Sequence, residues 1–184
     1  MTPGPLSPPR TALLLIDLQV DFASPEGAMA RAGRDLSAVP AALADAATLL
    51  AAARTAGVLP VFVRLLGSDL CVAGTPGTEF FGIAPRADEL VVTKPRFSAF
   101  TGTGLAGTLK DKGIDTLVLA GLTSECCVAS TAWHALEEDF RVVIAANACA
   151  AYETALHDNA LRALGLSGAM LAPTSDILAQ WNKK

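Results

Sequence analysis

The sequence is poor in basic charge, in aromatic residues and in long apolar runs. Its 184 residues hold 14 Lys and Arg against 18 Asp and Glu, a net charge of −4, so no basic surface favours nucleic acid or an anionic membrane. No apolar run approaches the ~18 residues of a membrane-spanning helix, and the proline-rich first ten residues lack a signal peptide's apolar segment. We therefore expect a cytoplasmic protein whose partner is a small molecule, with no nucleic-acid and no membrane partner.

Patterns typical of metal sites and disulfide frameworks are also missing. The four cysteines lie at positions 71, 126, 127 and 149, with no CxxC pair and no spacing suited to zinc. Two of them are adjacent, which argues against a secreted disulfide framework. Because the chain has only two histidines as well, we expect neither a metal nor another cofactor.

What the sequence does contain is an alternation of short apolar runs with segments rich in alanine and leucine. Strands are expected at 12–16, 58–65, 90–93, 116–120, 141–146 and 169–171, and helices at 40–55, 105–112, 128–138, 154–164 and 174–181. This rhythm predicts an α/β protein, a three-layer α/β/α sandwich with a Rossmann-like, six-stranded, mainly parallel sheet.

The length of the chain fits one domain. Residues 1–10 are expected to form a flexible N-terminal arm because four prolines interrupt them. A single domain then spans 11–184. Within it, residues 66–88 are punctuated by glycine and proline and predict a long irregular loop, and such loops in compact domains are usually functional.

Three reactive side chains follow predicted strands. Asp17 comes after LLLI, Lys94 after LVVT, and Cys127 in the turn behind TLVLA. Ligands of an open parallel sheet bind outside the carboxyl ends of its strands, so these side chains are expected at one edge. Taken singly, each has an ordinary interpretation: an aspartate that makes a turn, a solvated lysine, a cysteine in the core. Their coincidence favours an active site.

The stretch GLTSECCVASTA at 121–132 favours a cysteine nucleophile. Its two adjacent cysteines stand where a strand turns into a helix, so backbone N–H groups and the helix dipole can stabilise a thiolate and an oxyanion. A free thiol has a pKa of ~8.5. We expect the helix start and the Lys94 ammonium to favour the thiolate, and Asp17 to accept the thiol proton.

Three motifs together resemble the isochorismatase-like cysteine hydrolases. They are DLQVDF at 17–22, KPRFSAFTGTGL at 94–105 and GLTSECCVASTA at 121–132. The resemblance extends from about 11 to 175. The family includes nicotinamidases, N-carbamoylsarcosine amidases, ureidoacrylate amidases and isochorismatases, and its members are commonly oligomeric. The resemblance therefore implies a hydrolase that forms a homo-oligomer, a dimer or a tetramer.

The resemblance also implies which residues carry the reaction. Asp17, Lys94 and Cys127 match the family's catalytic residues, and the residues that follow the second cysteine select Cys127 over Cys126 as the nucleophile. Cys126 is then expected to turn away from the site and pack. Phe22 matches the residue that packs against substrate.

A cis peptide bond and an oxyanion hole are further implications of the resemblance. The cis bond falls between Leu122 and Thr123. It aims the backbone N–H of Thr123 beside that of Cys127, and these two groups would form the oxyanion hole.

The other candidate side chains have a weaker case. His134 and His157 lie in predicted helices away from strand ends, so a Cys-His dyad is not expected. Ser98 is expected to be structural. Cys149 is expected in the core, and nothing near Cys71 in the sequence activates it.

The resemblance and the residues together predict a reaction class. Nicotinamidases carry an Asp-x-His metal site after the second strand, whereas residues 64–80 here contain no histidine, which favours the metal-free branch. We expect cleavage of a C–N bond in a small amide or ureido compound through an acyl-enzyme on Cys127. Two alternatives stay open: isochorismatase-type hydrolysis of a vinyl ether, and a non-catalytic binding protein on the same fold. The intact Cys127 argues against the first, and the intact set of three against the second.

Overall fold

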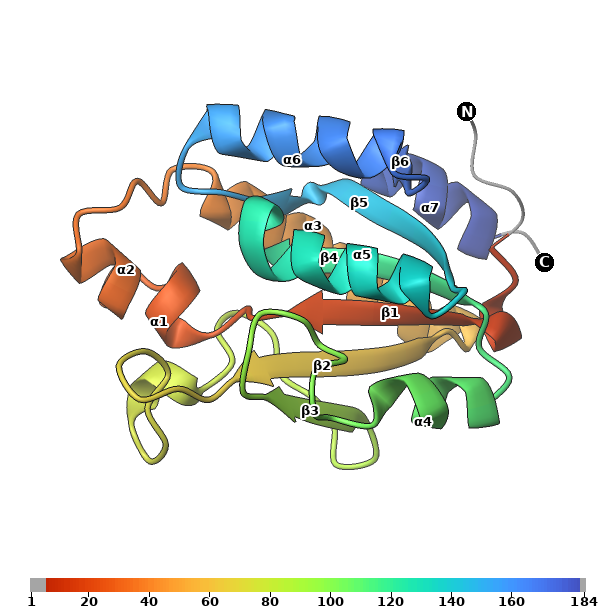
Figure 1. The fold of residues 1–184 in the computed structure, drawn as a ribbon, viewed down its shortest axis with the longest axis horizontal. Helices are drawn as coiled ribbons and strands as arrows, with labels where there is room; N and C mark the ends of the chain where they lie inside the picture. Colours follow the sequence, from red (N-terminus) through yellow and green to blue (C-terminus); the bar gives the residue numbers. More distant parts are fainter. Residues whose placement is uncertain (1–5, 183–184) are drawn as a thin grey trace.

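A parallel sheet forms the middle layer of the protein (Figure 1). The computed structural model describes residues 6–182. The six strands have the order β3-β2-β1-β4-β5-β6, and each neighbouring pair is parallel. The strands are β1 (Thr11–Ile16), β2 (Leu59–Leu65), β3 (Leu90–Lys94), β4 (Thr116–Leu122), β5 (Arg141–Ala150) and β6 (Met170–Ala172). The predicted three-layer α/β/α architecture is confirmed.

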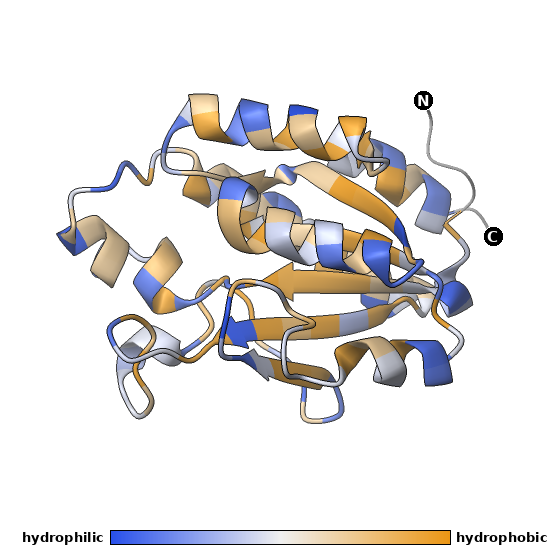
Figure 2. Ribbon diagram, in the orientation of Figure 1, coloured by the Kyte–Doolittle hydropathy of each residue, from blue (hydrophilic) through white to orange (hydrophobic). Residues whose placement is uncertain are grey.

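The two central strands are apolar on both faces. Every residue of β1 and β4 is buried, because helices cover both sides of a parallel sheet and leave no face for polar side chains. Figure 2 shows β1 as hydrophobic along most of its length. Successive side chains of β1 point to opposite faces, so Leu13 and Leu15 enter one core whereas Leu14 and Ile16 enter the other.

Helices form the two outer layers. They are α3 (Val39–Ala56), α4 (Leu105–Asp111), α5 (Ala129–Glu137), α6 (Thr154–Leu166) and α7 (Thr174–Trp181). Buried residues of α3 and α7 pack in the core of Leu13 and Leu15, and those of α4, α5 and α6 pack in the opposite core. In Figure 1, α4 and α5 cross in front of the sheet and α3 lies behind it. Within residues 6–182, no helix is both long enough and apolar enough to cross a membrane.

Short helical turns occupy three segments for which the sequence predicts no regular element. They are α1 (Val20–Ala23), α2 (Ala28–Arg31) and η2 (Pro76–Thr78). At the expected helix start after β4, the chain instead forms a π-helix, η3 (Ser124–Val128), ahead of α5. In Figure 1, α1 and α2 lie beyond the tip of β1. These turns therefore surround the carboxyl edge of the sheet, where ligands of such folds bind.

The described part of the predicted N-terminal arm is packed, which corrects the expectation for residues 6–10; residues 1–5 lie outside the described residues. The side chain of Leu6 is only 2 % exposed, and its N–H donates to Oε1 of Gln180 at 2.8 Å. Pro8–Arg10 form a short 3₁₀ turn, η1. Proline breaks longer elements but is tolerated in a first helical turn. The prolines of η1 therefore form part of an ordered turn directly before β1.

A glycine sets the spacing at the end of the central strands. Gly121 pairs with Ile16 across β4 and β1 and has a φ of 133°. A Cβ atom at this position would lie 2.0 Å from the backbone oxygen of Ile16, so only glycine fits. Because of this close approach, Asp17, which follows β1, lies beside the turn that follows β4.

Candidate active site

The three predicted reactive side chains meet at the carboxyl edge of the sheet. The Nζ of Lys94 donates to Oδ2 of Asp17 at 2.7 Å and to Sγ of Cys127 at 3.4 Å. Lys94 and Asp17 are fully buried, and Cys127 is 4 % exposed. An ion pair this far from water persists only when each charge is paired and hydrogen-bonded.

Asp17 is fixed by the backbone at the end of β1. Its φ of 51° lies in the left-handed region, which costs a non-glycine residue free energy and is concentrated at functional sites. Its N–H donates to the carbonyl of Val63 in β2 at 2.9 Å. The carboxylate therefore leaves the sheet between β2 and β4, facing the turn that holds Cys127.

Lys94 is the last residue of β3, where it pairs with Leu65 of β2. Besides Asp17 and Cys127, its ammonium donates to the carbonyl of Arg96 at 3.1 Å. These three partners match the three donors of an ammonium group. The lysine is consequently held in one position between the acid and the thiol.

The turn after β4 delivers the nucleophile candidate. The peptide bond between Leu122 and Thr123 is cis, and the next five residues form the π-helix η3. The carbonyl of Thr123 accepts the N–H groups of Cys126 at 3.1 Å and Val128 at 3.2 Å. Thr123 and Cys127 thus belong to one tight turn at the pocket, and single-turn π-helices are frequent at functional sites.

The surroundings of Cys127 disfavour its thiolate. The neighbouring Cys126 thiol, burial and the Asp17 charge raise the pKa of Cys127 above its usual value, and Lys94 only partly opposes them. This corrects the expectation of a thiolate favoured by the helix start and the lysine, because burial disfavours charge on sulfur. Burial also raises the pKa of Asp17. An acid so placed is suited to accept a proton near neutral pH.

The second carboxylate oxygen of Asp17 is open to a proton. Oδ1 is buried and, among the described residues, makes no hydrogen bond, whereas Oδ2 is held by Lys94. The carboxylate and the Cys127 thiol both contact the Lys94 ammonium, at 2.7 and 3.4 Å, so they lie next to each other. Asp17 can therefore take the thiol proton without giving up its lysine.

Cys126 lies on the pocket as well, contrary to the expectation that it packs away from the site. It is half-buried and lines the same cavity as Cys127. The expectation used the angle between neighbours on an α-helix, but η3 is a π-helix, whose wider turn separates adjacent side chains by a smaller angle. The backbone of this turn thus presents two thiols to the cavity.

A cavity of about 320 Å³ opens above Cys127. Phe22, the predicted substrate-packing residue, lines it from α1 and is only 6 % exposed. Its other walls are mainly apolar, with a few charged or hydroxyl-bearing side chains: Met29, Arg34, Leu65, Leu70, Phe97, Thr123, Glu125, Cys126, Tyr152, Glu153 and Leu156. A cavity of this size and composition suits a small ligand.

The structure adds two buried polar residues of the first motif that the sequence analysis passed over. Gln19 accepts the N–H of Leu65 at 2.7 Å and donates to the carbonyls of Leu65 and Thr78, both at 3.1 Å. Asp21 accepts the N–H of Cys71 at 2.8 Å. Asp17, Gln19 and Asp21 occupy every second position of the motif, and this spacing could have pointed to the two further residues. They fix the loop after β2 beside the cavity.

Tyr152 is a further pocket residue that the sequence analysis missed. It is the single tyrosine of the chain, follows the end of β5 at Ala150, and donates its hydroxyl to the carbonyl of Phe22 at 2.9 Å. The rule that located the other residues, a position just beyond a strand's carboxyl end, applies to it equally.

The two histidines support loops. Ser98 Oγ lies 3.1 Å from Nδ1 of His134, and Ser124 Oγ lies 2.7 Å from Nδ1 of His157. Neither histidine lines the cavity. Over residues 6–182, no group of three or more His, Cys, Asp and Glu side chains is arranged to hold a metal ion.

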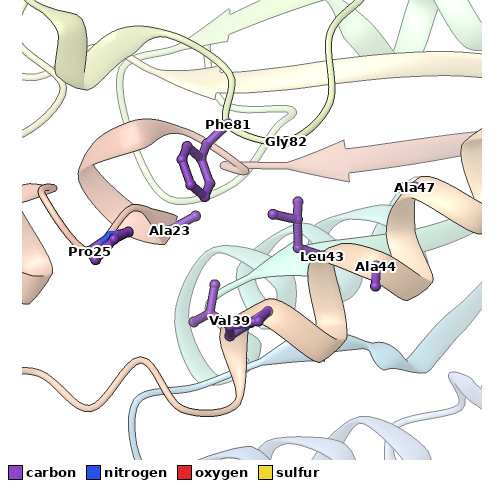
Figure 3. Close-up of a pocket in the computed structure, with 9 residues that line it drawn as sticks. Ala23, Pro25, Val39, Leu43, Ala44, Ala47, Phe81 and Gly82 are labelled. Atoms are coloured by element: carbon purple, nitrogen blue, oxygen red, sulfur yellow. The ribbon is translucent and has the colours of Figure 1, made fainter.

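A second hollow lies between α1, α3 and the loop after η2 (Figure 3). It measures about 430 Å³. Figure 3 shows Phe81 reaching toward Val39 and Leu43 of α3. Its lining is apolar and contains no nucleophile, acid or base, so it offers no candidate catalytic group.

Comparison with known proteins identifies the class of this fold and site. The model of the isochorismatase domain matches residues 11–176, which is most of the chain. The protein therefore belongs to the isochorismatase family and is a hydrolase, as the three motifs predicted.

Three similar proteins illustrate the range of the family. A ureidoacrylate amidohydrolase of Methylobacterium radiotolerans is 31% identical over 179 residues, covering 79% of this chain and 69% of that protein. Streptothricin hydrolase of Streptomyces noursei is 39% identical over 145 residues, covering 77% of this chain but only 50% of the relative. The crystal structure of a cysteine hydrolase from Pseudomonas syringae has a TM-score of 0.88 at 21% identity, covering 98% of this chain and 96% of that one. This last likeness shows the fold.

Proposed function

We propose that the protein hydrolyses a C–N bond of a small amide or ureido compound through a thioester on Cys127. The observation that carries the proposal is the buried contact of Lys94 with both Asp17 and Cys127. Burying an acid, a base and a thiol together costs free energy, and perturbed groups of this kind cluster at functional sites. Relatives named ureidoacrylate amidohydrolase and streptothricin hydrolase support the amide class.

The first half-reaction forms the thioester. As Sγ of Cys127 bonds to the substrate carbonyl carbon, the thiol proton passes to Oδ1 of Asp17, the oxygen without a hydrogen-bond partner among the described residues. Backbone N–H groups of Thr123 and Cys127 stabilise the oxyanion. The C–N bond then breaks, and the leaving nitrogen departs with the proton from Asp17.

The second half-reaction releases the acid. A water molecule gives a proton to Asp17 while its oxygen bonds to the thioester carbon, and the C–S bond breaks. Asp17 returns its proton to the sulfur of Cys127, which restores the resting thiol. Lys94 donates to Asp17 at 2.7 Å in this structure, and its positive charge compensates the negative charge that develops on the acid or the sulfur during the cycle.

Trapping the thioester tests this proposal directly. Turnover of a carboxamide and ureido panel, scored by ammonia release, is followed by rapid acid quench and peptide mass spectrometry. We expect the acyl group on Cys127 alone, and a rate at least about 10³-fold lower in Cys127→Ala. Cys149→Ala provides the matched control, because Cys149 is buried in β5, where its thiol donates to the Leu119 carbonyl at 3.7 Å, and it does not line the cavity. Undiminished hydrolysis by Cys127→Ala would exclude the mechanism.

A further inference from the structure

One carboxylate in the catalytic cavity has no use in the reaction just described. Glu125 follows Ser124 in η3 and lines the cavity. Its Oε2 is buried and has no hydrogen-bond partner among the described residues. A buried polar atom left without a partner costs about 1–3 kcal/mol, and more when it is charged, so natural proteins rarely keep one without a role.

Three donor groups of the site are engaged elsewhere. The hydroxyl of Tyr152 donates its single hydrogen to the carbonyl of Phe22. Ser124 is hydrogen-bonded to His157, and the Lys94 ammonium is used by Asp17, Cys127 and Arg96. The cavity therefore holds an acceptor that these groups leave unsatisfied and that a bound ligand can engage.

Glu125 and Tyr152 line the same cavity as Cys127. Burial raises the pKa of the Tyr152 hydroxyl, and the next contribution is the charge of Glu125. The carboxylate therefore lies in the chamber that a substrate of Cys127 would occupy.

The other charges of the cavity lie at its mouth. Arg34 and Glu153 line the rim and are exposed. Solvent screens exposed charges, so each contributes little to binding. The walls between rim and nucleophile are apolar and include Phe22 and Leu156. Glu125 is consequently the polar feature best placed to orient a ligand in this chamber.

We propose that Glu125 is a specificity residue that binds a cationic nitrogen group on the substrate, remote from the C–N bond that is cleaved. The inference rests on the proposed function, because it takes Cys127 as the point of attack. A protonated amine supplies both the missing hydrogen-bond donor and the compensating charge, and charge-assisted hydrogen bonds are the strongest neutral-pH contacts available to a carboxylate. An anionic substrate group would meet an unpaired buried acid and be rejected.

A matched substrate series tests the selection. The probes are the ω-amino amides 4-aminobutanamide, 5-aminopentanamide and 6-aminohexanamide, the unsubstituted alkanamides, and dicarboxylic acid monoamides with equal numbers of methylenes. We expect kcat/KM to be about 10–100-fold higher for the best amino amide than for its neutral partner, the range of a hydrogen bond to a charged group. Glu125→Gln should remove most of that ratio.

Glu153→Gln is the matched comparison, since it neutralises an exposed carboxylate of the same cavity. It should lower the ratio by less than about twofold. Equal losses in the two variants would show that the general charge of the mouth, and not Glu125, sets the preference, and would overturn the proposal. So would a wild-type preference for the neutral or anionic amides.

Binding to the inactive Cys127→Ala protein separates this inference from the proposed function. Calorimetric titration of the same compounds reads the preference without turnover. In this background, a preference for the amino amides that Glu125→Gln abolishes supports the inference. This holds even if the wild type hydrolyses none of the compounds, a result that would overturn only the proposed amide hydrolysis. Hydrolysis without the preference overturns only the role of Glu125.

Discussion

Replacing Lys94 with methionine should show how strongly the buried ammonium stabilises the fold. Methionine keeps an unbranched side chain but carries no charge. Asp17 would remain fully buried after losing its 2.7 Å partner. Removing one partner of a buried ion pair costs about 3–5 kcal/mol. For a chain of this length each kcal/mol lowers Tm by roughly 2–4 °C, so Tm should fall by roughly 6–20 °C.

The double variant Asp17→Asn with Lys94→Met is the matched control. It removes both charges, and replacing a whole buried pair with neutral groups is often neutral or stabilising. We expect its free energy of unfolding to lie within about 2 kcal/mol of the wild type. Urea unfolding at pH 7 measures both variants. The reasoning is refuted if the single variant loses under about 1 kcal/mol, or if the double variant loses as much as the single one.

The pH dependence of the same variant gives an independent measurement. Burial raises the pKa of Asp17 in the folded protein, and the Lys94 ammonium opposes that rise. A raised folded pKa contributes stability that is complete below the unfolded pKa and is lost as the pH rises through the folded pKa. Without the ammonium this loss grows. The deficit of Lys94→Met should therefore be smaller at pH 5 than at pH 8, and an equal deficit would point to lost packing instead.

Two further changes test the strand edge and the proton acceptor. Gly121→Ala would place a Cβ 2.0 Å from the Ile16 oxygen, so we expect a loss of more than about 3 kcal/mol in urea unfolding; a smaller loss would mean that β1 and β4 separate easily. Because the base must be ionised, kcat/KM should fall as the pH drops through the raised pKa of Asp17. Asp17→Asn should lower the rate about 10²–10⁴-fold and abolish that acid limb, whereas a wild-type profile flat down to pH 4 would contradict the role.

Elements with strong local signals are the ones that the sequence predicts best. The strand expected at 12–16 occupies 11–16, and the helix expected at 40–55 occupies 39–56. Their apolar runs and flanking proline or glycine act within a few residues. The four-residue helices α1 and α2 have no such signal. They are held by distant partners, such as the Cys71 N–H on Asp21, which no local pattern encodes.

The three central residues of the candidate site were predictable, but other residues of the cavity and the geometry and electrostatics of the site were not. The positions of Asp17, Lys94 and Cys127 after strands follow from the topology of a parallel sheet. The π-helical turn that exposes Cys126 and Glu125 to the cavity depends on backbone conformation. The raised pKa of the Cys127 thiol depends on the neighbouring Cys126 thiol and on burial. Both are properties of the packed structure, so composition and spacing could not supply them.

The hydrogen bonds of Gln19 have a consequence for how this protein can change. The amide side chain of Gln19 hydrogen-bonds to the backbone of Leu65, where β2 ends, and of Thr78, near the other end of the loop. These hydrogen bonds hold the two ends of the segment between Leu65 and Thr78 together, whatever the sequence of that segment is. Closing a longer loop costs only about 0.6 kcal/mol per doubling of length. The tip can therefore be lengthened, shortened or exchanged to reshape the cavity wall, while Asp17, two residues from Gln19, keeps its place.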